Sequence, residues 1–258
     1  MDLFYRRYGI EGNQPLIILH GLFGISDNWV TFGRRIADEG FDVIIPDQRN
    51  HGHSPHSDNF NYLALTDDLY DLIEKLELTN VYLVGHSMGG KVAMRFTLEN
   101  QLHVSKLLVV DMGLKAYGAR PHHKSIIDAL QSIDFKTVRS RGEVETLLAQ
   151  RIESERIRQF VMKNLYWKDK TTLDWRINLD GIARNLGEMF DAIETSILFS
   201  KPTLFVRGGA SDYILPEDYA TIRANFHRAE IFTIEGASHW VHAEAPEQFY
   251  QLASGFLI

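Results

Sequence analysis

Short apolar runs alternate with helix-type patterns over the first 111 residues. Four runs have the length of strands that are buried on both faces of a sheet: residues 16–19, 43–45, 81–84 and 107–110. Between them, apolar residues recur at helical spacing, most clearly over residues 65–76. Residues 3–8 are predicted to form an edge strand. This alternation predicts an α/β fold with a mostly parallel central sheet and helices on both faces.

The pattern changes after residue 112, where the strand series stops. The next segment, residues 113–198, contains no convincing buried strand and fits four polar helices: residues 122–131, 143–150, 153–164 and 181–194. The alternation then resumes, with strands at residues 201–207 and 229–234 and a closing helix at 240–256. We therefore expect a core domain made of residues 1–112 and 199–258, with residues 113–198 inserted as a helical block.

Composition and charge narrow the range of partners. The 258 residues include 27 Lys+Arg, 34 Asp+Glu and no Cys, for a net charge of −7. This acidic balance argues against nucleic acids and anionic membranes, because those surfaces are met with Lys and Arg. The lack of Cys excludes disulfides, thiolate catalysis and Cys-based metal sites. No segment approaches the roughly 18–20 apolar residues of a membrane span, and no signal-peptide pattern is seen, so we expect a cytoplasmic location.

The clearest chemical motif lies between a predicted strand and a predicted helix. Residues 85–90 read GHSMGG, which contains the G-x-S-x-G pattern of a nucleophile on a tight strand-to-helix turn. Ser87 is the predicted nucleophile, and the Met88 amide at the helix N-terminus is a predicted oxyanion donor. The alternative is a glycine-containing turn without chemistry.

Two other loops follow predicted strands and complete the candidate site. Residues 20–24 read HGLFG, and a backbone amide there can supply the second oxyanion donor; Leu22 is favoured, with Phe23 as the alternative. His239 lies in the loop before the closing helix, and neutral imidazole suits a general base near pH 7. Nearby His242 is expected to be structural.

The carboxylate that would orient His239 has two candidates. Asp111 ends the strand before the inserted block, and Asp212 follows the strand after it. Both positions can reach a histidine on the last loop, because the carboxyl ends of parallel strands share one edge of the sheet. Each could also be an ordinary capping residue, so the residues by themselves leave both open.

Binding residues are less well specified. Candidates for the wall of the substrate site are Phe23, Trp175, Phe190 and Trp240, although a place in the core is the favoured interpretation of each. The start of the inserted block is basic, with Lys115, Arg120 and Lys124, and could meet an anionic tail such as that of a coenzyme A thioester. A solvated helix face is the simpler interpretation. His51 and His53 lack a matching ligand cluster, so no metal and no cofactor are predicted.

These strings, in this order, resemble the α/β-hydrolase superfamily over nearly the whole chain. The similarity is closest to YbfF-type esterases and their mitochondrial abhydrolase relatives. It is carried by residues 20–24 (HGLFG), 49–52 (RNHG), 85–91 (GHSMGGK), 175–179 (WRINL) and 239–243 (HWVHA). The resemblance implies a small hydrolase of carboxylic esters or thioesters, with a helical cap inserted after the sixth strand. The oligomeric state is left open.

The resemblance also bears on the acid. In most of the superfamily the acid follows the strand after the cap, as Asp212 does; in the YbfF-type branch the acid ends the strand before it, as Asp111 does. Asp111 is therefore favoured. Together the residues predict acyl transfer through a Ser–His–Asp triad and an acyl-enzyme. A lyase, a C–C hydrolase or perhydrolase, and a non-catalytic receptor on the same fold are the alternatives.

Overall fold

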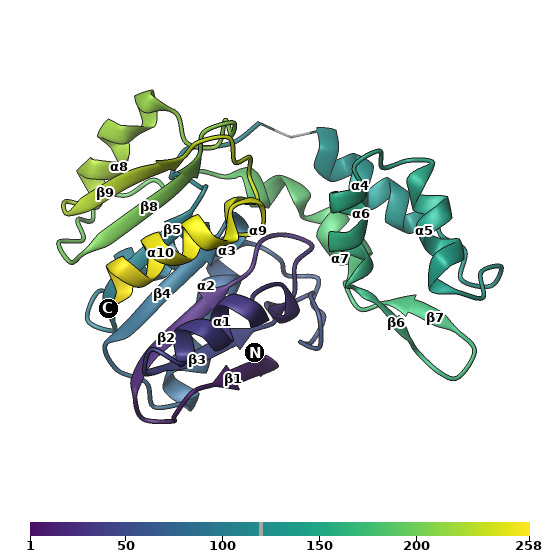
Figure 1. Cartoon of the computed structure of the whole chain (residues 1–258), viewed down its shortest axis with the longest axis horizontal. Coiled ribbons are helices and arrows are strands. Elements are labelled where there is room, and N and C mark those ends of the chain that lie inside the picture. Colours follow the sequence, from purple (N-terminus) through teal and green to yellow (C-terminus); the bar gives the residue numbers. More distant parts are fainter. Residues whose placement is uncertain (119–120) are drawn as a thin grey trace.

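A seven-stranded sheet forms the centre of the computed structural model, which describes residues 1–118 and 121–258 (Figure 1). The strands, in spatial order, are β1 (Tyr5–Tyr8), β3 (Phe41–Pro46), β2 (Gln14–Leu19), β4 (Val81–His86), β5 (Val104–Val110), β8 (Thr203–Gly208) and β9 (Ala229–Ile234). Within the described part of this seven-stranded sheet, only β1 pairs in antiparallel fashion, with β3. The predicted mostly parallel sheet is therefore confirmed.

Helices cover both faces of this sheet. Neighbouring residues of β2 point to opposite sides, so Ile17 and Leu19 belong to one apolar cluster and Leu16 and Ile18 to the other. The first cluster includes side chains of α2 (Tyr62–Lys75), α3 (Met88–Glu99) and α8 (Tyr219–Asn225). The second includes side chains of α1 (Val30–Ala37), α9 (Val241–Glu244) and α10 (Pro246–Leu257). Short 3₁₀ turns precede α1 and α8: η1 (Ser26–Asn28) and η3 (Pro216–Asp218).

The inserted segment follows the fifth strand of the chain and not the sixth, because β5 is the last of five strands that precede it. Its elements are α4 (Pro121–Gln131), α5 (Arg141–Ala149), α6 (Glu155–Met162), β6 (Leu165–Trp167), β7 (Leu173–Trp175), α7 (Leu179–Arg184) and η2 (Leu186–Phe190). Figure 1 shows most of these elements together on one side of the core. Among the described helices, none is both long and apolar enough to span a bilayer.

Two predicted helices had wrong bounds and one hairpin was not predicted, each for a local reason. The β6–β7 hairpin was missed because strands of three residues are too short to show alternation. The helix predicted over 181–194 instead begins after its cap, Asn178, and ends at Arg184, with η2 as a separate turn. The closing helix is interrupted before Pro246, which has no amide to continue a helix.

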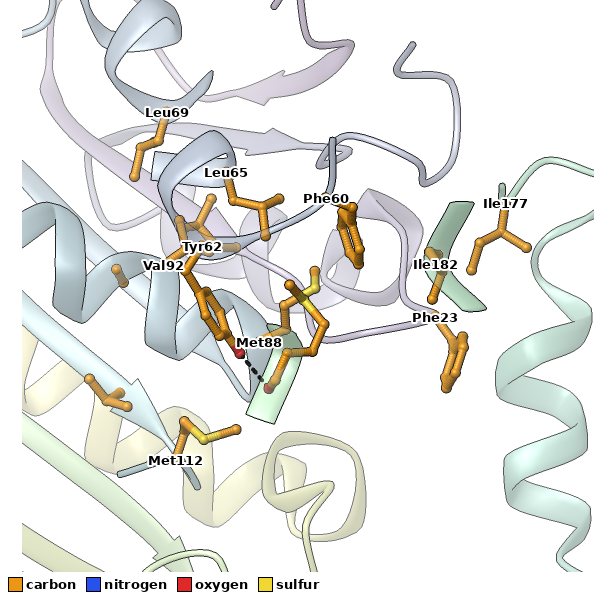
Figure 2. Close-up of a cluster of buried hydrophobic side chains, with 14 of the residues drawn as sticks. Phe23, Phe60, Tyr62, Leu65, Leu69, Met88, Val92, Met112, Ile177 and Ile182 are labelled. Carbon is orange, nitrogen blue, oxygen red and sulfur yellow. Dashed lines mark hydrogen bonds between the residues drawn. The ribbon is translucent and has the colours of Figure 1, made fainter. Parts of the chain in front are cut away.

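The inserted segment contacts the loops at the carboxyl ends of the strands. Asn178 donates its backbone N–H to the carbonyl of Asn50, after β3, over 2.9 Å. Asn164 donates its side-chain amide to the carbonyl of Phe23, after β2, over 2.8 Å. Figure 2 shows Phe23 on the side of the core that faces Ile177 and Ile182 of the insertion. Open α/β sheets bind their ligands at this edge, so the insertion lies where a substrate site is expected.

Candidate active site

The turn between β4 and α3 holds Ser87 in an unusual backbone conformation. Its φ is 54° and its ψ is −120°, and its amide donates to the carbonyl of Val110 over 3.1 Å. The flanking glycines are needed for space: a Cβ on Gly85 would lie 2.3 Å from the carbonyl oxygen of Gly89, and one on Gly89 would lie 2.4 Å from that of Leu19. These contacts explain why the turn needs glycine two residues before and two after the serine.

Backbone strain is concentrated at this edge of the sheet. Four of the described residues that follow β2, β3, β4 and β5 have positive φ angles without being glycine: Phe23 at 64°, Asn50 at 67°, Ser87 at 54° and Asp111 at 49°. Such conformations persist where the surrounding structure holds them, and they cluster at functional sites. The strain therefore marks the same edge of the sheet as the sequence motifs do.

A chain of hydrogen bonds joins three of the predicted residues. The Nε2 atom of His239 lies 2.8 Å from Oγ of Ser87, and its Nδ1 atom lies 2.8 Å from Oδ2 of Asp111. The Asp111 side chain is fully buried, whereas that of Asp212 is exposed. The carboxylate bonded to His239 is thus the one that precedes the insertion. This arrangement can remove a proton from a serine hydroxyl and hold the resulting imidazolium.

The end of β8 and the loop after it do not supply the carboxylate that bonds to His239, but they donate hydrogen bonds to Asp111. Ser211 donates its hydroxyl to Oδ2 of Asp111, and Gly208 donates its N–H to Oδ1 over 3.0 Å. Burial raises the pKa of Asp111 to about 7, while these two hydrogen bonds act in the opposite direction. Ser211 was not predicted from the sequence, where its position next to the candidate Asp212 was the only indication of a role at the site.

Two more side chains fix the position of His239. The Tyr213 ring stacks on the imidazole, with ring centroids 3.7 Å apart and planes 14° from parallel. The Nε2 atom of His86 lies 2.9 Å from the backbone carbonyl of His239. Burial lowers the pKa of His86 to about 3, so this ring is neutral and donates its single N–H to that carbonyl. His86 thus holds the loop that carries His239.

Two backbone amides next to Ser87 are available to an anion. Neither the Met88 nor the Leu22 amide has an acceptor among the described residues. The Phe23 amide, by contrast, donates to Nε2 of His51 over 3.2 Å. Gly21 brings this loop against the nucleophile, because a Cβ there would lie 3.2 Å from Cβ of Ser87. The geometry therefore favours Leu22 over Phe23 as the second donor.

His51 has a structural role in that loop. Its Nδ1 atom lies 2.9 Å from the carbonyl of Arg49, so Nδ1 carries the proton and Nε2 accepts. Burial lowers the pKa of His51 to about 3, which keeps it neutral. Across residues 1–118 and 121–258, no group of three or more His, Asp or Glu could hold a metal ion. Both ring nitrogens of His51 are therefore engaged by backbone groups, those of Arg49 and Phe23.

A narrow cavity opens from Ser87. Its lining is Leu22, Tyr62, Ser87, Met88, Met112, Tyr117, His123, Met189, Phe190 and Tyr213. The space that a water-sized sphere can enter is about 20 Å³, within a hollow of about 300 Å³ in all. The lining is mostly apolar and comes from both the core and the insertion. This composition suits the hydrocarbon part of a small ligand.

Only some of the predicted binding residues lie at the cavity. Phe190 lines the cavity; Phe23 does not, but its ring centroid lies 6.1 Å from that of His123, which does. Trp240 packs between Phe160 and His239 beside the site. Trp175 is instead core of the insertion, because its indole N–H donates to the carbonyl of Leu130. The aromatic residues Tyr62, Tyr117 and Tyr213 were not predicted, since their contact with the site depends on packing between distant segments.

The basic start of the insertion is partly neutralised. Lys115 pairs with Asp218 at 2.6 Å, and Lys124 pairs with Asp128 at 2.7 Å. Arg120, the third cation of this group, lies outside the described residues. The paired lysines favour the interpretation as a solvated surface over a site for an anionic tail.

Comparisons with known proteins agree with this architecture. A family model described as "alpha/beta hydrolase fold" matches residues 14–144. The sn-1-specific diacylglycerol lipase ABHD11 of Xenopus laevis is 35% identical, over 100% of this chain and 84% of that protein. Esterase YbfF of Escherichia coli (strain K12) is 31% identical, over 92% of this chain and 90% of that protein.

A solved structure described as a "Marine microorganism esterase" gives a TM-score of 0.93 at 40% identity, and covers 99% of both chains. The predicted resemblance to YbfF-type esterases and abhydrolase relatives is therefore confirmed. From its sheet, its nucleophile turn and these matches, we conclude that this chain belongs to the α/β-hydrolase fold family.

Proposed function

We propose that this protein is a serine hydrolase that cleaves carboxylic esters of small to medium acyl chains through an acyl-enzyme. The observation that carries the proposal is the chain of 2.8 Å hydrogen bonds from Ser87 through His239 to the buried Asp111. The names of the relatives, an esterase and a diacylglycerol lipase, support ester cleavage. Thioesters are a second substrate class with the same acyl chemistry, and remain part of the proposal.

The proposed reaction has two halves. Oγ of Ser87 attacks the ester carbonyl carbon while Nε2 of His239 takes its proton, and Asp111 stabilises the imidazolium. The amides of Met88 and Leu22 bind the developing oxyanion. The intermediate collapses as the alkoxide leaves with the proton from Nε2, and Ser87 remains acylated. Water then attacks the acyl carbon by the same route, which releases the acid and restores the serine hydroxyl.

The inserted segment would act as a cap. We assign it residues 113–198 and the core domain residues 1–112 and 199–258, because the insertion supplies Tyr117, Met189 and Phe190 to the cavity wall. The narrow apolar space next to Ser87 favours short acyl groups. A cytoplasmic location and the absence of metal, cofactor and nucleic-acid partners stay predictions from the sequence.

The direct test is turnover of p-nitrophenyl esters from acetate to decanoate, with the matching thioesters in parallel. We expect rates to be highest for the short and medium chains and to fall towards decanoate, because the free space beside Ser87 is small. A fluorophosphonate should label Ser87, which peptide mass spectrometry would locate. A folded protein that turns over none of these esters, and is not labelled, would contradict the proposal and favour a lyase or receptor.

Activity is expected to depend on pH through the Asp111–His239 pair. Burial raises the pKa of Asp111 to about 7, and catalysis requires the ionised carboxylate with neutral His239. The value of kcat/KM for p-nitrophenyl butyrate should therefore fall as the pH drops below about 7. Replacement Ser211→Ala removes a bond that lowers this pKa, so the midpoint should move upward. A midpoint that stays fixed or moves down in the variant would contradict this assignment.

A further inference from the structure

Lys91 is a fully buried cation for which the proposed reaction has no use. It lies one turn beyond Ser87 on α3, where its backbone N–H donates to the carbonyl of Ser87 over 3.0 Å. Its Nζ donates to the carbonyl of Lys115 over 3.0 Å and also to that of Asp191. No contact of Nζ with the side chains of Ser87 or His239 is found in the part of the chain that the structure describes.

Burial of this ammonium group in its charged form costs free energy of desolvation. Burial lowers the pKa of Lys91 to about 8. The rings of Tyr62 and Tyr117 flank Nζ at 5.5 and 5.0 Å. An apolar side chain would satisfy packing at such a position with less desolvation. The feature that distinguishes Lys91 from an apolar side chain at this position is therefore its pair of hydrogen bonds to backbone carbonyls.

Those contacts join the two ends of the insertion. We call residues 113–118 and 190–194 the stalk segments, because they connect the insertion to the core. They pair with one another: the Tyr117 N–H donates to the Phe190 carbonyl, and the Ile193 N–H to the Leu114 carbonyl, each over 2.8 Å. Nζ of Lys91 donates to one backbone carbonyl in each segment, those of Lys115 and Asp191. It is thus a three-way link between α3 and both stalk segments.

The same segments form a wall of the cavity beside Ser87. Tyr117 and Phe190 line it, together with Met189, which precedes the second stalk segment. Tyr62 of α2 donates its hydroxyl to the Met189 carbonyl over 3.0 Å, the dashed bond of Figure 2. A link that holds the stalk segments therefore also holds one wall of the narrow cavity beside Ser87.

We propose that Lys91 is a positioning residue that anchors both stalk segments to α3 and thereby sets the upper limit of acyl-chain length. The proposal rests on the proposed function, because it concerns which esters that site accepts. Release of the anchor lets Tyr117 and Phe190 move apart from the core and makes room for longer chains. The chemistry at Ser87 is left in place, since the backbone bond to its carbonyl does not involve the Lys91 side chain.

The test compares Lys91→Met with a matched control, Lys106→Met. Lys106 also donates to two backbone carbonyls, those of Phe256 and Leu257, but it joins β5 to α10 away from the cavity. In Lys91→Met, the ratio of kcat/KM for p-nitrophenyl octanoate to that for the acetate should rise about tenfold, with kcat for the acetate within about threefold of wild type. In Lys106→Met the ratio should not change. A ratio in Lys91→Met that stays within about twofold of wild type, or falls, would overturn the proposal.

A second readout needs no ester turnover. Amide hydrogen exchange at Tyr117 and Ile193 reports the bonds between the stalk segments. We expect exchange at both amides about tenfold faster in Lys91→Met and unchanged in Lys106→Met. Unchanged exchange in Lys91→Met would overturn the anchor even if the wild type is an active esterase. Faster exchange with an inactive wild type would support the anchor and contradict the proposed function. If Lys91→Met does not fold, Lys91→Gln carries the same expectations.

Discussion

Replacement of Ser87 by alanine is expected to lower kcat for p-nitrophenyl esters by at least about 10⁴-fold. The reason is that Oγ of Ser87 forms the bond to the acyl group. A water molecule in the place of Oγ is not held by the strand-to-helix turn as the serine is. The fold should persist, because neither the flanking glycines nor the hydrogen bond from the Ser87 N–H to the Val110 carbonyl depends on the hydroxyl. Steady-state rates and a thermal unfolding curve would be measured on the same preparation.

A matched control for this variant is Ser105→Ala. Ser105 lies on β5, and its hydroxyl contacts Asn80 rather than any residue of the site. Its removal should leave kcat within about twofold of wild type. If Ser87→Ala kept more than about a hundredth of the activity, the acyl-enzyme route through this residue would be excluded.

The second large effect is expected from the acid. Asp111→Asn should lower kcat by about 10⁴-fold, because an amide that donates to Nδ1 of His239 stabilises the wrong tautomer and cannot balance the imidazolium charge. Asp212→Asn is the matched control and should keep activity within about threefold of wild type, since its side chain is exposed. The reverse result would assign the acid to Asp212.

Asp111→Asn also tests whether the buried carboxylate lowers the stability of the fold. The pKa of Asp111 is raised from 3.8 to about 7, so the folded protein holds this proton more tightly than the unfolded chain does. Ionisation of Asp111 therefore destabilises the fold as the pH rises through that interval. Asp111→Asn removes this cost, and its thermal midpoint at about pH 8 should equal or exceed that of wild type. A lower midpoint would show that the carboxylate also contributes to stability.

Local patterns were sufficient to predict some parts of the molecule. The buried strands are short runs of apolar residues, and the nucleophile turn is a local string whose glycines are required by contacts under 3 Å. His239 was found because its loop directly follows the last strand and precedes a helix. Each of these features depends on residues that are close together in the sequence.

Other parts depend on contacts between distant segments. The choice between Asp111 and Asp212 needed the distance to a residue more than a hundred positions away from Asp111. Leu22 was favoured from the sequence, but the reason that disfavours Phe23 is a distant contact: its amide donates to His51, whose protonation the carbonyl of Arg49 determines. The tyrosines of the cavity come from three separate segments, so no periodicity could have grouped them.

The positions of Ser87 and Asp111 on adjacent strands carry a consequence for engineering. β4 and β5 pair in register, with His86 opposite Val110, so the residues that follow them are neighbours whatever lies beyond residue 111. The insertion begins only after this pair is complete. A chimera that exchanges residues 113–198 for those of a relative should therefore retain the spacing between nucleophile and acid, and the insertion can be treated as an interchangeable module for substrate range.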